Sequence, residues 1–177
     1  MPERRAGEGS TLPLRPSQTC PGHPAAQPDL VPLAKKLAQL VDDLAPFDDP
    51  HDRLAFIVDR AKRIPPLPVN ERTDANRVRG CVSVVWLVGE VREGNCTFRF
   101  DGDSPVVRGL LALLCEFFSG TPPADIAASD IDPLDALGLL ESLSPTRRNG
   151  LTSARARIRE FARTHVSECE CGQVAQP

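Results

Sequence analysis

Two strand-like runs joined by a glycine turn limit what this chain can fold into more than any other feature. The first run covers residues 81–92 and is rich in branched and aromatic side chains, which fit a pleated, half-buried surface. The second covers residues 95–100 and alternates apolar with polar side chains, as a half-buried strand does. With Glu93 and Gly94 between them, the runs predict an antiparallel hairpin. A lone hairpin is only marginally stable, so the fold needs a helical cover or a third short strand, for which the stretch before Gly80 is a candidate.

Apolar residues at helical spacing predict that cover. The expected helices are residues 29–44, 49–63, 105–119 and 145–165, and Thr121 with Pro122 marks the start of another. Residues 132–142 predict a short helix or turn. The helix at 105–119 is the clearest, because Ser104 suits the N-cap, Pro105 the first helical position and Gly120 the end. Helices followed by a hairpin and then by more helices indicate an α+β fold with a small antiparallel sheet.

Composition and charge divide the chain and exclude two classes of partner. Residues 1–28 are rich in proline and predict a disordered tail, residues 29–166 a single domain, and residues 167–177 a flexible C-terminal tail. A net charge of −3 over 177 residues does not favour binding to nucleic acid or to a membrane surface. The longest apolar run falls short of the about 20 residues that span a membrane, and the N-terminus lacks the pattern of a secretory signal. We therefore expect a cytoplasmic protein. The basic residues of the last helix indicate a solvated face: Arg155, Arg157, Arg159 and Arg163.

The strongest candidate for chemistry is Cys81, at the junction of a bend and a strand. Gly80 permits a sharp bend directly before it, and Arg77 and Arg79 are close in sequence. Cationic neighbours lower the pKa of a thiol, and the thiolate is the nucleophile. Free cysteines are also common as small buried hydrophobic residues. From local context alone, Cys81 is either a reactive thiol or a core residue.

The other cysteines give weaker signals. Cys20 and His23 have a C-x-x-H spacing, and Cys169 and Cys171 form a second pair, so the two tails could together hold a zinc ion. Two unstructured tails with incidental cysteines are the simpler interpretation. Cys115 falls within the apolar 105–119 helix and is interpreted as core packing.

Six short motifs follow one another along residues 47–163, nearly all of the expected domain. They are Ile64-Pro65-Pro66-Leu67-Pro68, Val78-Arg79-Gly80-Cys81-Val82-Ser83-Val84-Val85-Trp86, Asp101-Gly102-Asp103, Val107-Arg108-Gly109-Leu110, Leu137-Gly138-Leu139 and Leu143-Ser144-Pro145-Thr146-Arg147-Arg148-Asn149-Gly150-Leu151. This series resembles the SufE family of sulfur-acceptor proteins, the partners of cysteine desulfurases in iron–sulfur cluster assembly. The resemblance implies a SufE-like fold, which is related to that of the IscU-like iron–sulfur scaffolds.

The resemblance also implies a function centred on Cys81. This thiol would take persulfide sulfur from a cysteine desulfurase of the SufS-like or CsdA-like kind, stimulate that enzyme, and pass the sulfur to iron–sulfur cluster assembly. An iron–sulfur scaffold complex is a further candidate partner. No metal ion or organic cofactor is expected. Such a protein is a covalent persulfide carrier, an accessory to sulfur transfer rather than an independent catalyst.

Four further positions are implied to support the loop or the partner. Gly80 would permit movement of the acceptor loop, and Ser83 belongs to the same motif. Asp103 matches an acidic residue beside the acceptor loop of the family, and Arg147 matches an arginine near its partner-facing surface. By themselves, Asp103 equally suits a carboxylate favoured by a helix dipole, and Arg147 a solvated first-turn residue.

Two other functions stay open at this point. An iron–sulfur or zinc-binding scaffold would need three or more convergent thiolates, whereas Cys81, Cys96 and Cys115 are expected on a bend, a strand and a core helix. A thiol redox sensor would need a resolving cysteine near Cys81, and Cys96 across the hairpin is the candidate.

Overall fold

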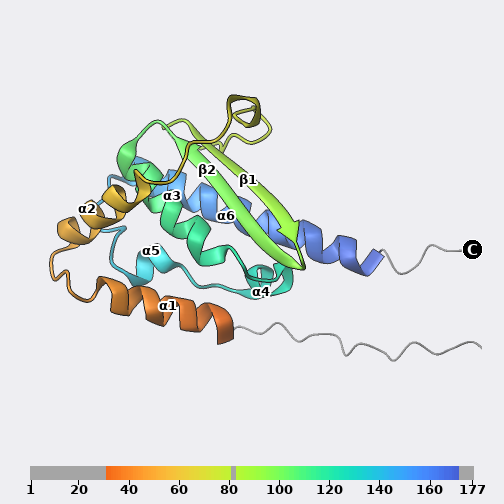
Figure 1. Ribbon diagram of the computed structural model, residues 1–177, viewed down its shortest axis with the longest axis horizontal. Helices are drawn as coiled ribbons and strands as arrows, with labels where there is room; N and C mark the ends of the chain where they lie inside the picture. The colour runs from red at the N-terminus through yellow and green to blue at the C-terminus, as the bar shows by residue number, and fades with distance from the viewer. Residues whose placement is uncertain (1–30, 81–82, 172–177) are drawn as a thin grey trace, which may run out of the picture.

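The computed structural model describes residues 31–80 and 83–171 of the chain. In order, its elements are α1 (Val31–Leu44), α2 (Pro50–Ala61), the 3-10 helix η1 (Val69–Glu71), β1 (Val85–Arg92), β2 (Asn95–Gly102), α3 (Pro105–Phe118), α4 (Pro123–Ala128), α5 (Pro133–Ala136) and α6 (Pro145–Cys171). Figure 1 shows the hairpin lying across α3 and α6, with α1 on the far side of α3. The expected α+β fold with a small antiparallel sheet is confirmed.

The hairpin follows from its turn and its alternation. Glu93 and Gly94 both have positive φ, at 51° and 79°, which is the conformation that joins two twisted strands through two residues. The register pairs Val85 with Gly102 at one end and Arg92 with Asn95 at the turn. The apolar side chains of β2 are buried against the helices: Cys96, Phe98 and Phe100.

The first strand is shorter than the sequence indicates. β1 begins at Val85, although strand character was expected from residue 81. Ser83 and Val84 are described and precede the strand, while positions 81 and 82 lie outside the described residues. The physical reason is pairing: Gly102, the last residue of β2, already lies opposite Val85, so β2 offers no partner to Val84. A branched side chain alone does not make a strand without that partner.

The stretch before Gly80 contributes a bridge and not a third strand. Arg77 pairs with Trp86 in an isolated antiparallel bridge. Beside it, the amide of Leu87 donates to the carbonyl oxygen of Asn76 at 2.8 Å. Across residues 31–80 and 83–171, the sheet therefore consists of β1 and β2, with a short flanking segment on β1.

α3 is the centre of the core. Ser104 has the extended backbone of an N-cap residue and Pro105 is the first helical residue, as expected. Leu110, Leu114 and Phe117 are almost completely buried, because the hairpin covers one side of α3 while α1, α2 and α6 cover others. Cys115 is buried among them, which confirms its interpretation as core packing.

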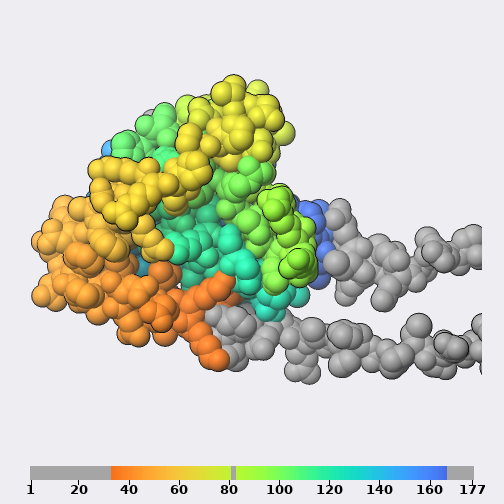
Figure 2. Space-filling model, in the orientation of Figure 1, coloured from red at the N-terminus to blue at the C-terminus, as the bar shows by residue number. Residues whose placement is uncertain are grey.

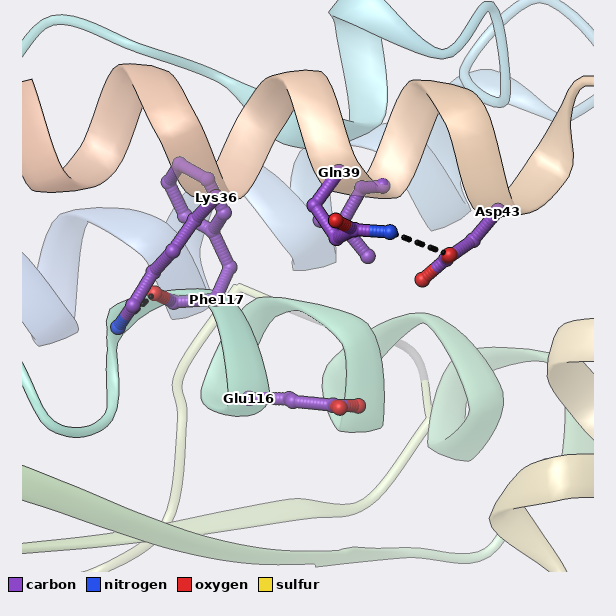
Figure 3. A pocket seen from close by; sticks show the side chains of 6 residues that line it. Lys36, Gln39, Asp43, Glu116 and Phe117 are labelled. Atoms are coloured by element: carbon purple, nitrogen blue, oxygen red, sulfur yellow. Dashed lines mark hydrogen bonds between the residues drawn. The ribbon is translucent and has the colours of Figure 1, made fainter.

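A single lysine holds α1 against the end of α3. Lys36 Nζ donates to the carbonyl oxygens of Phe117 and Ser119, at 3.2 and 2.6 Å, and to Thr121 Oγ1 at 2.9 Å. Figure 3 shows Lys36 reaching from α1 towards Phe117, at one side of a pocket of about 210 Å³ between the two helices. The last carbonyls of a helix lack partners within the helix, so this cation satisfies groups that would otherwise be exposed or unpaired.

The predicted start of α4 was wrong. α4 begins at Pro123 and not at Thr121, because Thr121 is buried and its carbonyl oxygen accepts from the amide of Cys96 at 2.9 Å. The short helix or turn expected at 132–142 is confirmed, because α5 ends at Ala136 and turn residues continue to position 142. Gly138 follows with φ of 67°, a left-handed conformation that ends helices.

α6 extends to Cys171, beyond the expected end at residue 165. It passes close to β1 at Gly89, where an added Cβ would lie 2.9 Å from the ring of Phe161. None of the helices in the described part of the chain is both long and apolar enough to span a membrane.

Three of the four arginines expected on a solvated face of α6 are half-buried, whereas Arg163 is exposed. Arg155 donates to the carbonyl oxygen of Ile131 at 3.0 Å, and Arg159 pairs with the carboxylate of Asp130 at 2.9 Å. Arg157 donates to the carbonyl oxygen of Ala75. These side chains fasten two irregular segments to the helix, a long-range role that the local charge pattern does not reveal.

Candidate functional site

The candidate site is a six-residue loop, residues 79–84, that is closed at its base. The amide of Val78 donates to the carbonyl oxygen of Val85 at 2.8 Å, so the residues on either side of the loop form a pair. Cys81 belongs to this loop by sequence, but it lies outside the described residues, as does Val82. The described part of the site is therefore its two arms, with Gly80 on one side and Ser83 on the other.

Gly80 has the backbone conformation that the sequence predicts for a bend. Its φ is 89°, in the left-handed region that residues with a Cβ rarely adopt. The residue is exposed, yet it lies close to α6: an added Cβ would be 2.9 Å from Ser153 Oγ. Ser153 Oγ itself donates to the carbonyl oxygen of Asn149 at 3.0 Å. The first arm of the loop therefore rests on a defined point of α6.

The second arm is tied to the start of α3 through Asp103. The amide of Asp103 donates to the carbonyl oxygen of Val84 at 3.2 Å, while its side chain is exposed. Asp103 directly precedes the N-cap Ser104, so its carboxylate is also close to the positive end of the α3 dipole. Ser83, next along the arm, is half-buried. The structure thus brings Gly80, Ser83 and Asp103 to one loop.

Arg147 is placed differently from the other three residues. It is exposed in the first turn of α6. From Ser153, the α6 residue that contacts Gly80, it is six residues away, which corresponds to roughly 9 Å along the helix axis and about 120° around it. Arg147 therefore occupies a surface near the site but a different side of α6.

A groove of about 410 Å³ with several charged side chains in its lining lies along the first arm, between residues 74–79 and α6. Its lining includes Arg79, which directly precedes Gly80 in the sequence, and Ser153, which lies next to Gly80 in space. The charged groups of its lining are Arg77, Arg79, Arg157, Asp74 and Glu160, an excess of one positive charge. Figure 2 shows the segment that leads to the loop, in yellow, exposed above the hairpin.

Sequence reasoning missed the buried charged residues that tie the segment before the loop to the hairpin. Asp101 is buried near the end of β2 and pairs with Arg72 at 2.8 Å and with Arg108 at 3.4 Å. The available signal was Arg108 itself, a cation inside the most apolar run of the chain. A charge at such a position needs a buried partner, which sequence alone does not identify.

Cys96 and Cys115 are poorly suited to thiolate chemistry. Burial raises the pKa of the Cys96 thiol to about 11, and it also raises the pKa of the Cys115 thiol. Cys96 pairs with Val91 near the hairpin turn, six residues along β1 from Val85. That separation is roughly 20 Å at the rise of a strand, so Cys96 is at the opposite end of the hairpin from the loop.

The described residues do not gather a metal site. Within residues 31–80 and 83–171, no three His, Cys, Asp or Glu side chains are grouped as they would be around a metal ion. The suggested zinc ligands lie elsewhere: Cys20 and His23 are outside the described residues, as are the side chains of Cys169 and Cys171.

Comparison with known proteins gives a consistent family. Residues 38–162 match the SufE family, described as an Fe-S metabolism associated domain. An uncharacterized SufE-like protein of Rhizobium etli is 39% identical over 136 residues, which cover 74% of this chain and 92% of that protein. SufE-like protein 1, chloroplastic/mitochondrial, of Arabidopsis thaliana is 34% identical over 140 residues, 77% of this chain and 38% of that protein.

A solved structure supports the same fold. The solution structure of a hypothetical protein from Thermus thermophilus superposes with a TM-score of 0.62 at 23% identity, covering 75% of this chain and 96% of that one. The family match includes both strands of the hairpin, the 79–84 loop and most of α6. The chain therefore belongs to the SufE family, whose domain is associated with iron–sulfur metabolism.

Proposed function

We propose that this protein is a sulfur carrier, which accepts persulfide sulfur onto Cys81 from a cysteine desulfurase and delivers it to iron–sulfur cluster assembly. The observation that carries the proposal is the closed 79–84 loop, which contains Cys81, in a chain whose family match runs through it. The association of the family with iron–sulfur metabolism supports the role of a sulfur carrier.

The transfer needs no oxidant, metal or organic cofactor. The Cys81 thiolate attacks the outer sulfur of the desulfurase persulfide, a new S–S bond forms on Cys81, and the old S–S bond breaks. The desulfurase cysteine leaves as a thiolate, so charge and electrons balance. The chemistry is that of thiol–disulfide exchange, in which thiolate fraction and steric access set the rate.

The arms of the loop suit this exchange. The left-handed conformation of Gly80 turns the chain directly before the acceptor. Arg77 and Arg79 are exposed on the first arm and favour a thiolate nearby. Asp103 holds the second arm through its amide, and Arg147 is available on the α6 surface for the desulfurase. A reducing compartment such as the cytoplasm keeps a carrier thiol available between cycles.

Labelled sulfur tests the proposal. The protein is mixed with a SufS-like or CsdA-like desulfurase and ³⁵S-cysteine, and the persulfide is located by non-reducing mass spectrometry. We expect label on Cys81 and none on a Cys81→Ser variant, which also fails to stimulate the desulfurase. Cys115→Ala is the matched control, because it removes a buried thiol distant in sequence from the loop and is expected to accept sulfur normally.

Three outcomes would overturn the proposal. Sulfur transfer to the Cys81→Ser variant would show that Cys81 is not the acceptor. Stoichiometric iron or zinc in the purified protein would favour a scaffold, and a Cys81–Cys96 disulfide formed under mild peroxide would favour a redox sensor.

A further inference from the structure

A buried carboxylate joins the hairpin to the segment that leads into the loop. Asp101 lies on β2, and only 8% of its side chain is exposed. Its two oxygens have different partners: Oδ2 is 2.8 Å from an Arg72 nitrogen, and Oδ1 is 3.4 Å from Arg108 Nε. Oδ1 also accepts from the amide of Gly102 at 2.9 Å. One carboxylate thus contacts two cations that come from distant parts of the chain.

Arg72 belongs to the segment that leads into the loop. Its Nε donates to the carbonyl oxygen of Leu67 at 3.0 Å while the other side of the guanidinium meets Asp101. The same guanidinium lies 5.9 Å from the ring centroid of Trp86, the β1 residue directly opposite Asp101. Arg72 therefore contacts the segment before the loop, β1 and β2 at once, through a fork of donors that a lysine lacks.

Arg108 fixes the start of the same segment. From α3, it donates to the carbonyl oxygens of Ala61 and Ile64, at 2.7 and 2.6 Å, while its Nε faces Asp101. Ala61 ends α2 and Ile64 begins the stretch that runs to the loop. The carboxylate therefore connects both the beginning and the middle of that stretch to the hairpin.

We propose that Asp101, Arg72 and Arg108 form a clasp that positions the acceptor loop, holding residues 72–78 in register with β1. A buried ion network of this kind seldom stabilises a fold better than apolar packing would, so its use here is better explained by positioning than by stability. The clasp acts on the loop through two hydrogen bonds, from Val78 to Val85 and from Leu87 to Asn76. Its role in sulfur transfer rests on the proposed function, whereas its effect on these two hydrogen bonds does not.

Amide hydrogen exchange of Arg72→Lys and Asp101→Asn tests the clasp directly. We expect the amides of Val78 and Leu87 to exchange about ten- to hundredfold faster, since a charge-assisted hydrogen bond no longer opposes local opening. The amide of Phe98, which donates to Ser119 Oγ at 3.0 Å, is the internal reference and keeps its rate. Because Arg72 is 33% exposed, Arg72→Lys remains folded even if Asp101→Asn does not.

The sulfur-transfer assay adds a second, separate measurement. With saturating desulfurase, the maximal rate of acceptance onto Cys81 should fall about tenfold in Arg72→Lys, with the half-saturating desulfurase concentration unchanged, because preorganisation is lost and not binding. Glu116→Gln, which breaks the exposed pair between Arg60 of α2 and Glu116 of α3, is the matched control and should change neither the exchange rates nor the rate of sulfur acceptance.

Two results overturn the clasp. Unchanged exchange at Val78 and Leu87 shows that the loop base does not depend on it, and equal acceleration at Phe98 shows a general loss of stability. If exchange responds as expected but Cys81 never accepts sulfur even in the unaltered protein, the clasp stands and the proposed function fails.

Discussion

Gly80 and Ser153 meet where the candidate loop touches α6: a Cβ at position 80 would lie 2.9 Å from Ser153 Oγ. The same residue has φ of 89°, so two independent constraints disfavour a side chain there. One constraint is local, the left-handed backbone, and the other is tertiary, the serine on a helix more than 60 residues away in sequence. Substitutions at positions 80 and 153 can separate the two constraints experimentally.

Gly80→Ala should lower the free energy of unfolding by about 1–2 kcal/mol from the backbone term alone, with a further loss from the contact. Gly94→Ala is the matched control, because Gly94 has φ of 79° and nothing lies within 4 Å of its added Cβ. Chemical denaturation measures both. We expect Gly80→Ala to be the more destabilising, and Ser153→Ala, combined with it, to recover the difference. Equal losses in the two glycine variants would mean that the Ser153 contact has no energetic effect.

The sequence predicts those parts of the fold that depend on local pattern. The turn at Glu93 and Gly94, the alternation of β2 and the long apolar stripe of α3 are all local signals, and each was found. The start of β1 was misplaced because strand formation at Val84 depends on a partner residue in β2. Strand propensity is a property of one residue, whereas strand pairing depends on two residues that are far apart in sequence.

The same distinction applies to the candidate site. The bend at Gly80 was predictable, since only glycine suits it so readily. The contacts of Lys36, Ser153 and Asp101 were not, because each joins groups far apart in sequence. Arg157 is a further example. Its spacing predicts a solvated side chain, yet it donates to the carbonyl oxygen of Ala75, in the segment before the loop.

Gly89→Ala should destabilise the packing of α6 on the hairpin. Its Cβ would lie 2.9 to 3.0 Å from three carbons of the Phe161 ring, so the helix or the ring must move. Overpacking of this kind costs about 1–3 kcal/mol. The melting temperature is expected to fall, and Phe161→Leu in the same protein should restore part of it. A Gly89→Ala protein as stable as the original would show that α6 moves away freely.

Lys36→Met should cost about 1–3 kcal/mol, because three acceptors at the end of α3 lose their donor. Burial lowers the pKa of Lys36, which is consistent with its position between α1 and α3. Lys35→Met removes an exposed neighbouring cation and is expected to change stability little. Urea denaturation compares the two variants. Similar effects from both would mean that the loss comes from charge in general and not from the contacts that Lys36 makes.

Thiol labelling at pH 8 should not reach Cys96 or Cys115 in the folded protein. A pKa of about 11 leaves roughly one thiolate in 1,000 at Cys96 under these conditions, and both thiols are also buried. The informative variant has serine in place of Cys20, Cys81, Cys169 and Cys171. It should incorporate no iodoacetamide when folded and label at both remaining cysteines when denatured. Rapid labelling of the native variant would contradict the buried placement.

The raised pKa of Cys96 also predicts a dependence of stability on pH. The thiol loses its proton near its ordinary value of 9.0 in the unfolded chain but near 11 in the folded one. Between these values the folded state binds more protons, so the stability that Cys96 contributes is fully present below pH 9 and declines as pH rises to about 11. The free energy of unfolding, measured relative to Cys96→Ala, isolates this thiol because other titrating groups are common to both proteins. The difference should be constant from pH 7 to 9 and shrink above it, whereas a difference that stays constant to pH 11 would mean that the folded thiol titrates like a solvated one.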